Sequence, residues 1–312
     1  MHRLVLPTFY FVISLLIGCS DETPQTPSIQ SSNSGSIDRN GAILQYVREG
    51  NGTPAVVIGS SVLYPRFYSA SLRKHLDLIF VDGRHFAPSY SPSESELAAL
   101  TMETWADDVE ALRESLGIDQ WLVIGHSIQA QIALAYAHKY PRAIKGLVLI
   151  AGVPYAGGDV DQALEEIWDS QATESRKTQH AINVQGLEEK LAATPEDRQF
   201  VVYYIANAAL YWANPTYDST PLWEGVRTST ALDQLVESLP GRAVVREIIE
   251  DIATPTLVVV GKHDYAVPYT IWESLVENNP AVSYVLMDQD SHNPQAEGPD
   301  RFDPILLNWL EH

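Results

Sequence analysis

The sequence predicts an α/β protein with a mostly parallel sheet, helices on both faces and one inserted helical segment. Apolar runs typical of buried strands alternate with stretches of helical spacing over residues 42–154 and again over 251–312. Between residues 155 and 250 polar helical stretches replace this alternation. Ser127 lies between an apolar run and a helical stretch. A chain of 312 residues is long enough to bury a large core around such a sheet.

The individual elements follow from local patterns. Strands are expected where apolar residues alternate with polar ones or form short runs, at 42–48, 55–59, 76–82, 121–125, 144–151, 256–261 and 284–287. Gly117 and Pro141 are stop signals after two helical stretches. The expected helical stretches are 95–116, 130–140, 160–172, 196–212, 270–277 and 301–311. Because strands and helices alternate, the strands should be parallel and covered on both faces.

The same pattern predicts how the chain is divided. Residues 39–154 and 251–312 are expected to form one core, and residues 155–250 a helical cap inserted between its two parts. Residues 19–38 are rich in Ser, Thr, Pro, Asn and Gln and contain few apolar residues. Such a segment cannot bury enough apolar surface to order itself, so we expect a flexible tether.

Residues 1–18 have the pattern of a signal peptide, with His2 and Arg3 before an apolar run too short to span a membrane comfortably. The four residues Leu-Ile-Gly-Cys at 16–19 resemble the lipobox of bacterial lipoproteins. The resemblance implies that Cys19 is lipidated and holds the protein at a membrane of the bacterial cell envelope. The alternatives are a secreted or periplasmic protein, or an uncleaved anchor, with an incidental cysteine.

The composition argues against several kinds of partner and cofactor. With 20 Lys and Arg against 40 Asp and Glu, the formal charge is −20, so the chain lacks the basic surface that nucleic acid or anionic lipid requires. Cys19 is the only cysteine, which excludes an intrachain disulfide and a thiolate metal cluster. The histidines show no metal-ligand spacing and there is no phosphate-binding loop, so no metal or cofactor is expected.

The segment GHSIQ, residues 125–129, has the context of a nucleophile elbow, because an apolar run precedes it and a helix follows. A serine on such a turn exposes its hydroxyl at the edge of the sheet. The next backbone N–H, that of Ile128, would lie at a helix N-terminus and could bind a developing oxyanion.

This segment resembles the nucleophile elbow of the alpha/beta-hydrolase superfamily, although Gln129 stands where the family usually has glycine. Residues 82–89, DGRHFAPS, resemble its Asp-x-Arg-Gly-x-Gly-x-Ser segment, with His85 in place of a glycine. Three further segments resemble the oxyanion loop, the strand before the catalytic acid and the histidine loop: PAVVIGSS at 54–61, TPTLVVVGKHD at 254–264 and DSHNP at 290–294. The most similar branch is the proline-iminopeptidase-like one.

The resemblance implies a catalytic triad of Ser127, Asp264 and His292, in the chain order that this fold uses. A serine hydroxyl becomes a good nucleophile when a base takes its proton, and histidine suits that task near neutral pH. Asp264 would orient His292 and stabilise the imidazolium. We expect the second oxyanion donor to be the N–H of Ser60, with Ser61 as the alternative.

The cap is the segment expected to select the substrate. Its aromatic residues could line the pocket or simply bury a cap helix, and the candidates are Trp168, Tyr204, Tyr211 and Trp212. Glu165 and Glu166 could receive a substrate amine, although a solvated helix face is the favoured interpretation. Gln129 is expected to point into the pocket and contribute to substrate binding. The alternative is that it packs within the elbow, where its amide must find partners.

We therefore expect a serine hydrolase that forms an acyl-enzyme on Ser127 from a small acyl or aminoacyl substrate. A serine in the elbow indicates an ester, lactone, thioester or amide bond. The alternative is a non-catalytic ligand-binding protein on the same fold, which the departure at Gln129 keeps open. The sequence predicts neither the substrate nor the oligomeric state.

Overall fold

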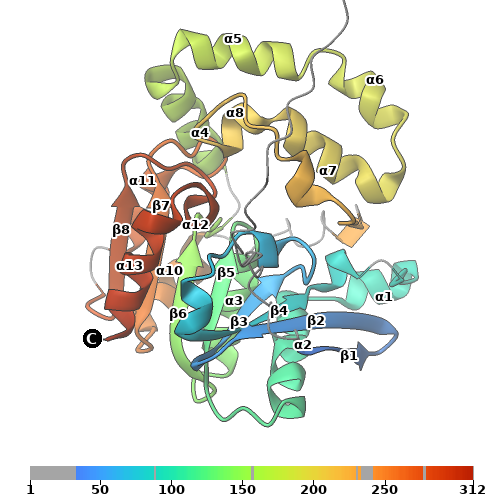
Figure 1. The fold of residues 1–312 in the computed structure, drawn as a ribbon, viewed down its shortest axis with the longest axis vertical. Helices are drawn as coiled ribbons and strands as arrows, with labels where there is room; N and C mark the ends of the chain where they lie inside the picture. Colours follow the sequence, from blue (N-terminus) through green and yellow to red (C-terminus); the bar gives the residue numbers. More distant parts are fainter. Residues whose placement is uncertain are drawn as a thin grey trace, which may run out of the picture. The chain divides into compact units, whose positions relative to one another are not determined.

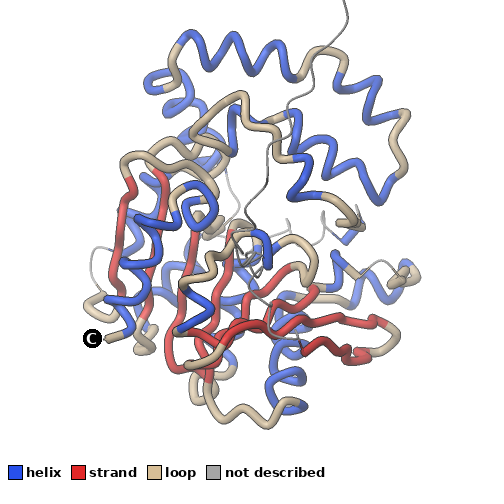
Figure 2. Tube along the Cα trace, in the orientation of Figure 1, coloured by secondary structure: helices blue, strands red, loops and turns tan. Residues whose placement is uncertain are grey.

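The chain forms a sheet of eight strands with helices on both faces (Figure 1 and Figure 2). The computed structural model describes residues 33–87, 89–155, 158–229, 231–232, 242–276 and 279–311. The strands are β1 (Asn33–Arg39), β2 (Ala42–Gly50), β3 (Thr53–Gly59), β4 (Leu76–Asp82), β5 (Trp121–His126), β6 (Ile144–Ile150), β7 (Thr256–Gly261) and β8 (Val282–Met287).

The helices fall into those of the core and those of the inserted segment. The core helices are α1 (Glu94–Ala99), α2 (Met102–Ser115), α3 (Gln129–Lys139), α10 (Arg242–Asp251), α11 (Tyr269–Val276), α12 (Pro294–Glu297) and α13 (Pro299–Leu310). The inserted helices are α4 (Gly158–Gln171), α5 (Glu174–Asn183), α6 (Leu187–Ala192), α7 (Glu196–Ala206) and α8 (Ala208–Tyr211). Short 3-10 helices are η1 (Tyr64–Arg66), η2 (Leu72–Lys74), η3 (Arg84–Phe86) and η4 (Thr220–Trp223).

The strands lie in the order β1-β2-β4-β3-β5-β6-β7-β8. β2 pairs antiparallel with β1 and β4, and all other neighbours in the sheet are parallel. The predicted mostly parallel α/β sheet is therefore confirmed. Because parallel strands end at the same edge, the segments that follow β3, β4, β5, β7 and β8 meet there, which is where open α/β sheets bind ligands.

Period-two alternation along the central strands produces two apolar faces. In β3, Val56 and Ile58 belong to the apolar cluster that also contains residues of α2, α3, α10 and α11. Their neighbours Ala55 and Val57 belong to the cluster on the other face, with α13 and part of the cap. Both faces of the central strands are thus buried, which explains why these strands are continuous apolar runs in the sequence.

The start of the core differs from the prediction. Residues 33–38, which the sequence placed in the flexible tether, belong to β1, paired with β2 from Asn33 opposite Arg48 to Arg39 opposite Ala42. Asn40 and Gly41 adopt φ values of +55° and +87° in the intervening turn, as a tight hairpin requires. The β1 side chains are mostly exposed, so no apolar alternation marks this strand. The predicted signal peptide, Cys19 and the rest of the tether lie outside the described residues.

The inserted segment forms a helical cap, and α4 to α8 gather beyond the sheet in Figure 1. The predicted cap, residues 155–250, is too long at its end, because α10 packs on the core. Val245 and Ile249 of α10 are buried in the same cluster as Val258 of β7. The sequence does carry a boundary signal here, because Pro240 and Gly241 stand directly before α10, but the prediction placed the end of the cap after it. Among the described helices, none is long and apolar enough to cross a membrane.

Candidate active site

Ser127 lies on the sharp turn between β5 and α3. Its φ is +55°, a left-handed conformation that costs about 1–3 kcal/mol for a residue with a side chain and persists where the surroundings enforce it. The Ser127 N–H donates to the Ile150 carbonyl over 2.9 Å, and the Ser127 carbonyl accepts from the Val153 N–H over 3.1 Å. A Cβ on Gly125 would lie 2.7 Å from the Gln129 carbonyl oxygen, so only glycine fits there. The turn thus has the form of a nucleophile elbow.

His292 and Asp264 form a buried hydrogen-bonded pair. Nδ1 of His292 lies 2.9 Å from Oδ2 of Asp264, and their exposed fractions are 1% and 0%. The other carboxylate oxygen, Oδ1, accepts from the N–H groups of Ala266 and Val267, each over 2.8 Å. Because Asp264 is held at both oxygens, it fixes the imidazole orientation and leaves Nε2 as the nitrogen that can take a proton from a nucleophile.

The elbow and the histidine loop are in contact through His126. The rings of His126 and His292 are 4.9 Å apart, and Nε2 of His126 lies 2.8 Å from the backbone oxygen of His292. Among the hydrogen bonds of the described residues, none joins the side chains of Ser127 and His292. Catalytic hydrogen bonds of this kind often tighten only in the complex with substrate.

Hydrogen bonding separates the candidate oxyanion donors into N–H groups that are available and one that is not. The N–H of Ser61 donates to Oδ1 of Asp82 over 2.6 Å and is therefore already used. Within the described residues, the N–H groups of Ser60 and Ile128 donate to no protein acceptor. This difference favours Ser60 over Ser61 as the second donor beside Ile128. Burial raises the pKa of Asp82 to about 6, while the Ser61 N–H opposes that rise by stabilising the carboxylate.

Two of the predicted cap aromatics, Tyr211 and Tyr204, lie beside His292. The ring of Tyr211 lies 5.2 Å from that of His292, and Tyr204 stacks on Tyr211 with ring centroids 4.0 Å apart. The Tyr204 hydroxyl donates to Oδ1 of Asn293 over 3.1 Å. The cap thereby contacts His292 and its neighbour Asn293 directly.

The other two aromatics have different surroundings. Trp212 is 3% exposed and packs 6.3 Å from Phe67, ring centroid to ring centroid. Trp168 packs edge-on against Tyr265, the residue after Asp264, and against His180. Both therefore take part in packing of the cap, which was the alternative that the sequence left open.

The expectation that Gln129 points into the pocket is not what the structure shows. Gln129 is only 4% exposed, and its amide lies 3.1 Å from the Tyr64 hydroxyl and 3.0 Å from Nε2 of His85. The amide has found partners inside the elbow, so the packing alternative holds. Gly59 adds room here, because a Cβ there would run into the Tyr64 ring and lie 3.3 Å from Cγ of Gln129. The sequence could not reveal this, since His85 is 44 residues away.

Sequence reasoning missed Glu297. Its Oε2 accepts from the backbone N–H of Ala213 over 2.6 Å, and its Oε1 accepts from the N–H groups of Asn293 and Ser291 over 3.0 and 3.2 Å. Burial raises the pKa of Glu297 to about 7, although these N–H groups favour the carboxylate. Its position five residues after His292 was the only signal in the sequence.

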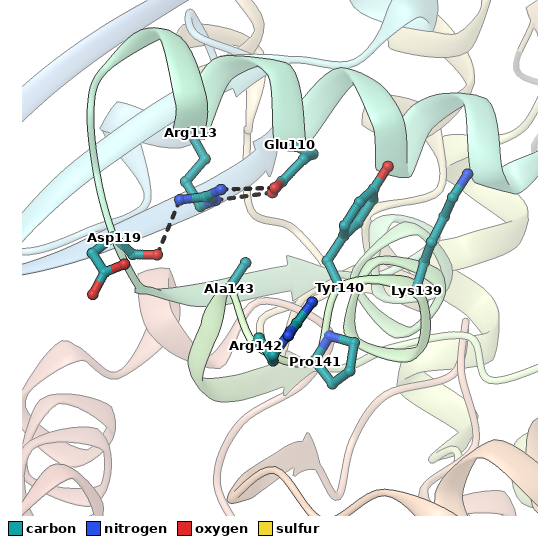
Figure 3. A pocket seen from close by; sticks show the side chains of 8 residues that line it. All are labelled: Glu110, Arg113, Asp119, Lys139, Tyr140, Pro141, Arg142 and Ala143. Atoms are coloured by element: carbon teal, nitrogen blue, oxygen red, sulfur yellow. Dashed lines mark hydrogen bonds and ion pairs between the residues drawn. The ribbon is translucent and has the colours of Figure 1, made fainter.

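A separate surface pocket of about 480 Å³ lies beside α2 and the end of α3 (Figure 3). Asp119 and Ala143 in its wall precede β5 and β6, so it lies at the edge of the sheet opposite Ser127. Two of the cations in its wall are paired: Arg113 with Glu110 over 2.7 Å and Lys139 with Asp107 over 2.6 Å. The pocket has no part in the chemistry at the elbow.

Comparison with known proteins agrees with this geometry. The chain is 29% identical over 270 residues to the AB hydrolase superfamily protein YclE of Bacillus subtilis (strain 168), which covers 86% of this chain and 95% of that protein. It is 22% identical over 253 residues to a proline iminopeptidase of Saccharolobus solfataricus, covering 76% of each. An alpha/beta fold family hydrolase from Bacillus anthracis str. Sterne superposes with a TM-score of 0.64 at 18% identity, over 89% of this chain and 99% of that one. The family described as alpha/beta hydrolase fold matches residues 51–299, so this chain belongs to the alpha/beta-hydrolase superfamily.

Proposed function

We propose that this protein is a serine hydrolase that forms an acyl-enzyme on Ser127 and releases it with water. The observation that carries the proposal is the strained elbow at Ser127 together with the buried His292–Asp264 pair at the same edge of the sheet. A serine with φ of +55° has a strained backbone. Such strain is kept at functional sites, and here it would serve to expose the hydroxyl. Membership of the superfamily supports hydrolysis as the reaction class.

In this mechanism Nε2 of His292 takes the hydroxyl proton as Oγ of Ser127 attacks the carbonyl carbon. The carbonyl π electrons move to its oxygen, which the N–H groups of Ile128 and Ser60 stabilise. The tetrahedral intermediate collapses, the bond to the leaving group breaks, and His292 gives its proton to that group. A water molecule, deprotonated by His292, then attacks the acyl carbon; the bond to Oγ of Ser127 breaks, and His292 returns the proton to Oγ as the acid is released. Asp264 stabilises the imidazolium in both steps.

Among ester, lactone, thioester and amide substrates we favour a carboxylic ester or lactone with an apolar acyl group. Tyr211 presents an aromatic ring beside His292, which suits an apolar group. The similarity to a proline iminopeptidase raises an aminoacyl substrate as the second candidate, which needs a carboxylate to receive its amine. Glu165 and Glu166 are exposed on α4, and the Glu297 carboxylate already accepts three backbone N–H groups. These observations favour the ester.

A fluorophosphonate probe tests the proposal. It should label wild-type protein at Ser127 and leave Ser127→Ala unlabelled, because only an activated serine reacts. The non-catalytic alternative predicts no labelling of either protein. A panel of aryl esters, lactones and aminoacyl arylamides then ranks the bonds: an arylamide turned over faster than every ester would reverse the order that we propose.

We also propose that the enzyme is a lipoprotein held in the bacterial cell envelope through Cys19. The support is the sequence pattern at residues 1–19 alone: a basic start, an apolar run and a single cysteine at its end. An acidic net charge of −20 gives little attraction to anionic lipid, so a covalent anchor would be what holds the enzyme at a membrane.

A further inference from the structure

The two departures from the superfamily pattern contact each other. Gln129 replaces the usual glycine of the elbow and His85 replaces the glycine after the buried arginine. Their side chains are 4% and 2% exposed, and Nε2 of Gln129 lies 3.0 Å from Nε2 of His85. Glycines lie against both: a Cβ on Gly83 would lie 2.6 Å from the His85 ring, and one on Gly59 would run into the Tyr64 ring and lie 3.3 Å from Cγ of Gln129.

The contact continues as a buried hydrogen-bonded chain. The Tyr64 hydroxyl lies 3.1 Å from Oε1 of Gln129 and 3.1 Å from Nδ1 of His126. Nε2 of His126 lies 2.8 Å from the backbone oxygen of His292. The chain His85–Gln129–Tyr64–His126–His292 therefore connects the loop after β4, the elbow, the oxyanion loop and the histidine loop.

The positions of the protons in this hydrogen-bonded chain can be assigned starting from the end at His126 and His292. Burial lowers the pKa of His126 to about 3, so its ring is neutral and carries one proton. A backbone carbonyl can only accept, so that proton is on Nε2 and is donated to His292. Nδ1 of His126 then accepts, and the Tyr64 O–H donates to it.

The His85 end of this hydrogen-bonded chain requires that its hydrogen bonds point in the same direction. Burial lowers the pKa of His85 to about 3 as well, and its Nδ1 is buried without a partner among the described residues, so the single ring proton belongs on Nε2. Nε2–H of His85 therefore donates to Gln129. Tyr64 has already used its proton on His126, so Gln129 must donate to Tyr64. Flipping the Gln129 side-chain amide by about 180° satisfies both hydrogen bonds, because its oxygen then faces His85 and its nitrogen faces Tyr64.

We propose that His85 and Gln129 form a positioning pair for the hydrolase reaction. The proposal rests on the proposed function: the pair acts through Tyr64 and His126 on the groups that stabilise the oxyanion and move the proton. The Tyr64 N–H donates to the Ser60 carbonyl over 3.2 Å, next to the N–H that is available for the oxyanion. At the other end the chain holds the backbone of His292.

The two residues should act as a unit. Among the described residues, the His85 side chain hydrogen-bonds to Gln129 alone, and Gln129 hydrogen-bonds to His85 and Tyr64 alone, so His85 is connected to His126 through Gln129. Loss of either partner leaves a buried polar group unpaired and lets Tyr64 move. A shifted oxyanion donor or base weakens the transition state and affects kcat more than KM. Removing both partners restores the glycines of the superfamily pattern and leaves no buried donor unpaired, because the Tyr64 O–H still donates to His126.

The test is a double-mutant cycle with His85→Gly, Gln129→Gly and the double variant, measured as kcat, KM, the labelling rate of Ser127 and Tm. Each single variant should lose about 10-fold or more in kcat and in labelling rate, with KM within about 3-fold. The double variant should lose no more than the worse single one. His85→Gln, which keeps a donor near the Nε2 position, should retain most activity. His138→Ala, an exposed histidine on α3, is the control and should match wild type.

Losses that multiply in the double variant, or a lower Tm with unchanged kcat and labelling, would overturn the pair's positioning role while leaving the hydrolase proposal intact. Absence of Ser127 labelling in wild type would instead overturn the function itself, and the pair's role with it. Nitrogen NMR of labelled histidines provides a second measurement. His126 and His85 should both be the Nε2–H tautomer, and a charged or Nδ1–H ring at His126 would contradict the chain.

Discussion

The Glu297 carboxylate accepts a 2.6 Å hydrogen bond from the backbone N–H of Ala213, a residue of the cap. The same carboxylate accepts from Ser291 and Asn293, the neighbours of His292 on either side. One side chain therefore joins the cap to the loop that carries the proposed base. The Asn293 side chain adds to this connection by donating to the Tyr211 carbonyl over 2.9 Å.

Glu297→Gln should lower kcat/KM by about 10-fold to 100-fold, because a small displacement of a catalytic group has effects of this size. Glutamine has one accepting oxygen, so its NH2 group would face the N–H of Ala213 or those of Ser291 and Asn293. Steady-state kinetics with the best ester substrate measures the effect. Asp300→Asn, an exposed carboxylate on α13, is the matched control and should leave kcat/KM unchanged. Equal kinetics for the two variants would mean that the cap and His292 are not coupled through Glu297.

Stability should depend on pH through two buried carboxyl groups. Burial raises the pKa of Glu297 to about 7 and that of Asp82 to about 6, from ordinary values of 4.5 and 3.8. The folded protein therefore binds more protons than the unfolded chain between these values, so the contribution of both groups to stability is present at acid pH and is lost as pH rises toward about 7. Relative to wild type, Glu297→Gln should become more stable as pH rises through this window. Urea denaturation across the window measures it, and a constant difference would contradict the raised pKa of Glu297.

The triad makes a separate prediction. Ser127→Ala and His292→Ala should each lower kcat by about 10⁶-fold, as in serine proteases, and the double variant should lose little more. The reason is that neither residue catalyses without the other. Measured turnover in Ser127→Ala near that of wild type would exclude Ser127 as the nucleophile. Multiplying losses would show that the two residues do not act together.

The anchor can be tested in a bacterial host that processes lipoproteins. Cys19 should carry acyl chains and be the first residue of the mature protein, which mass spectrometry of the N-terminal peptide measures. Cys19→Ser should release the enzyme from the membrane fraction while purified enzyme keeps the wild-type kcat. An unmodified Cys19 in host-expressed protein would contradict the lipoprotein proposal.

The sequence could predict the features that local chemistry determines. The apolar runs of β3 and β7 predict buried parallel strands because both sheet faces are covered. The elbow at Ser127 needs a strand, a small residue and a helix in succession, and all are contiguous in the chain. The strand that precedes Asp264 and the loop that carries His292 likewise have short local signatures.

Other features depend on contacts between distant segments. β1 is held by main-chain pairing to β2 and has exposed side chains, so its sequence resembles that of a linker. The place of Gln129 was decided by His85, which comes from another segment. No pattern within a single segment carries information of this kind. The helix α10 is different, because Pro240 and Gly241 mark its start in the sequence and its apolar residues Val245 and Ile249 pack in the core.

The ring of Tyr211 packs 5.2 Å from that of His292 and 4.0 Å from that of Tyr204, centroid to centroid. Tyr211→Ala removes this ring but keeps the backbone carbonyl that accepts from Asn293. If the ring contacts the acyl group, its loss should raise KM for a long or aromatic acyl ester by about 10-fold or more, since burying such a group contributes about 1.5–3 kcal/mol. KM for an acetyl ester should change less, because a short acyl group would not reach the ring.

The control is Tyr203→Ala, which removes a 41% exposed tyrosine from the cap helix α7. It should change neither KM nor the rate at which a small fluorophosphonate labels Ser127. If Tyr211→Ala lowered labelling and the turnover of both esters equally, the ring would be needed for the cap to fold and not for recognition. If it changed neither ester, the acyl group would lie elsewhere, and the preference for apolar acyl esters would lose its structural basis.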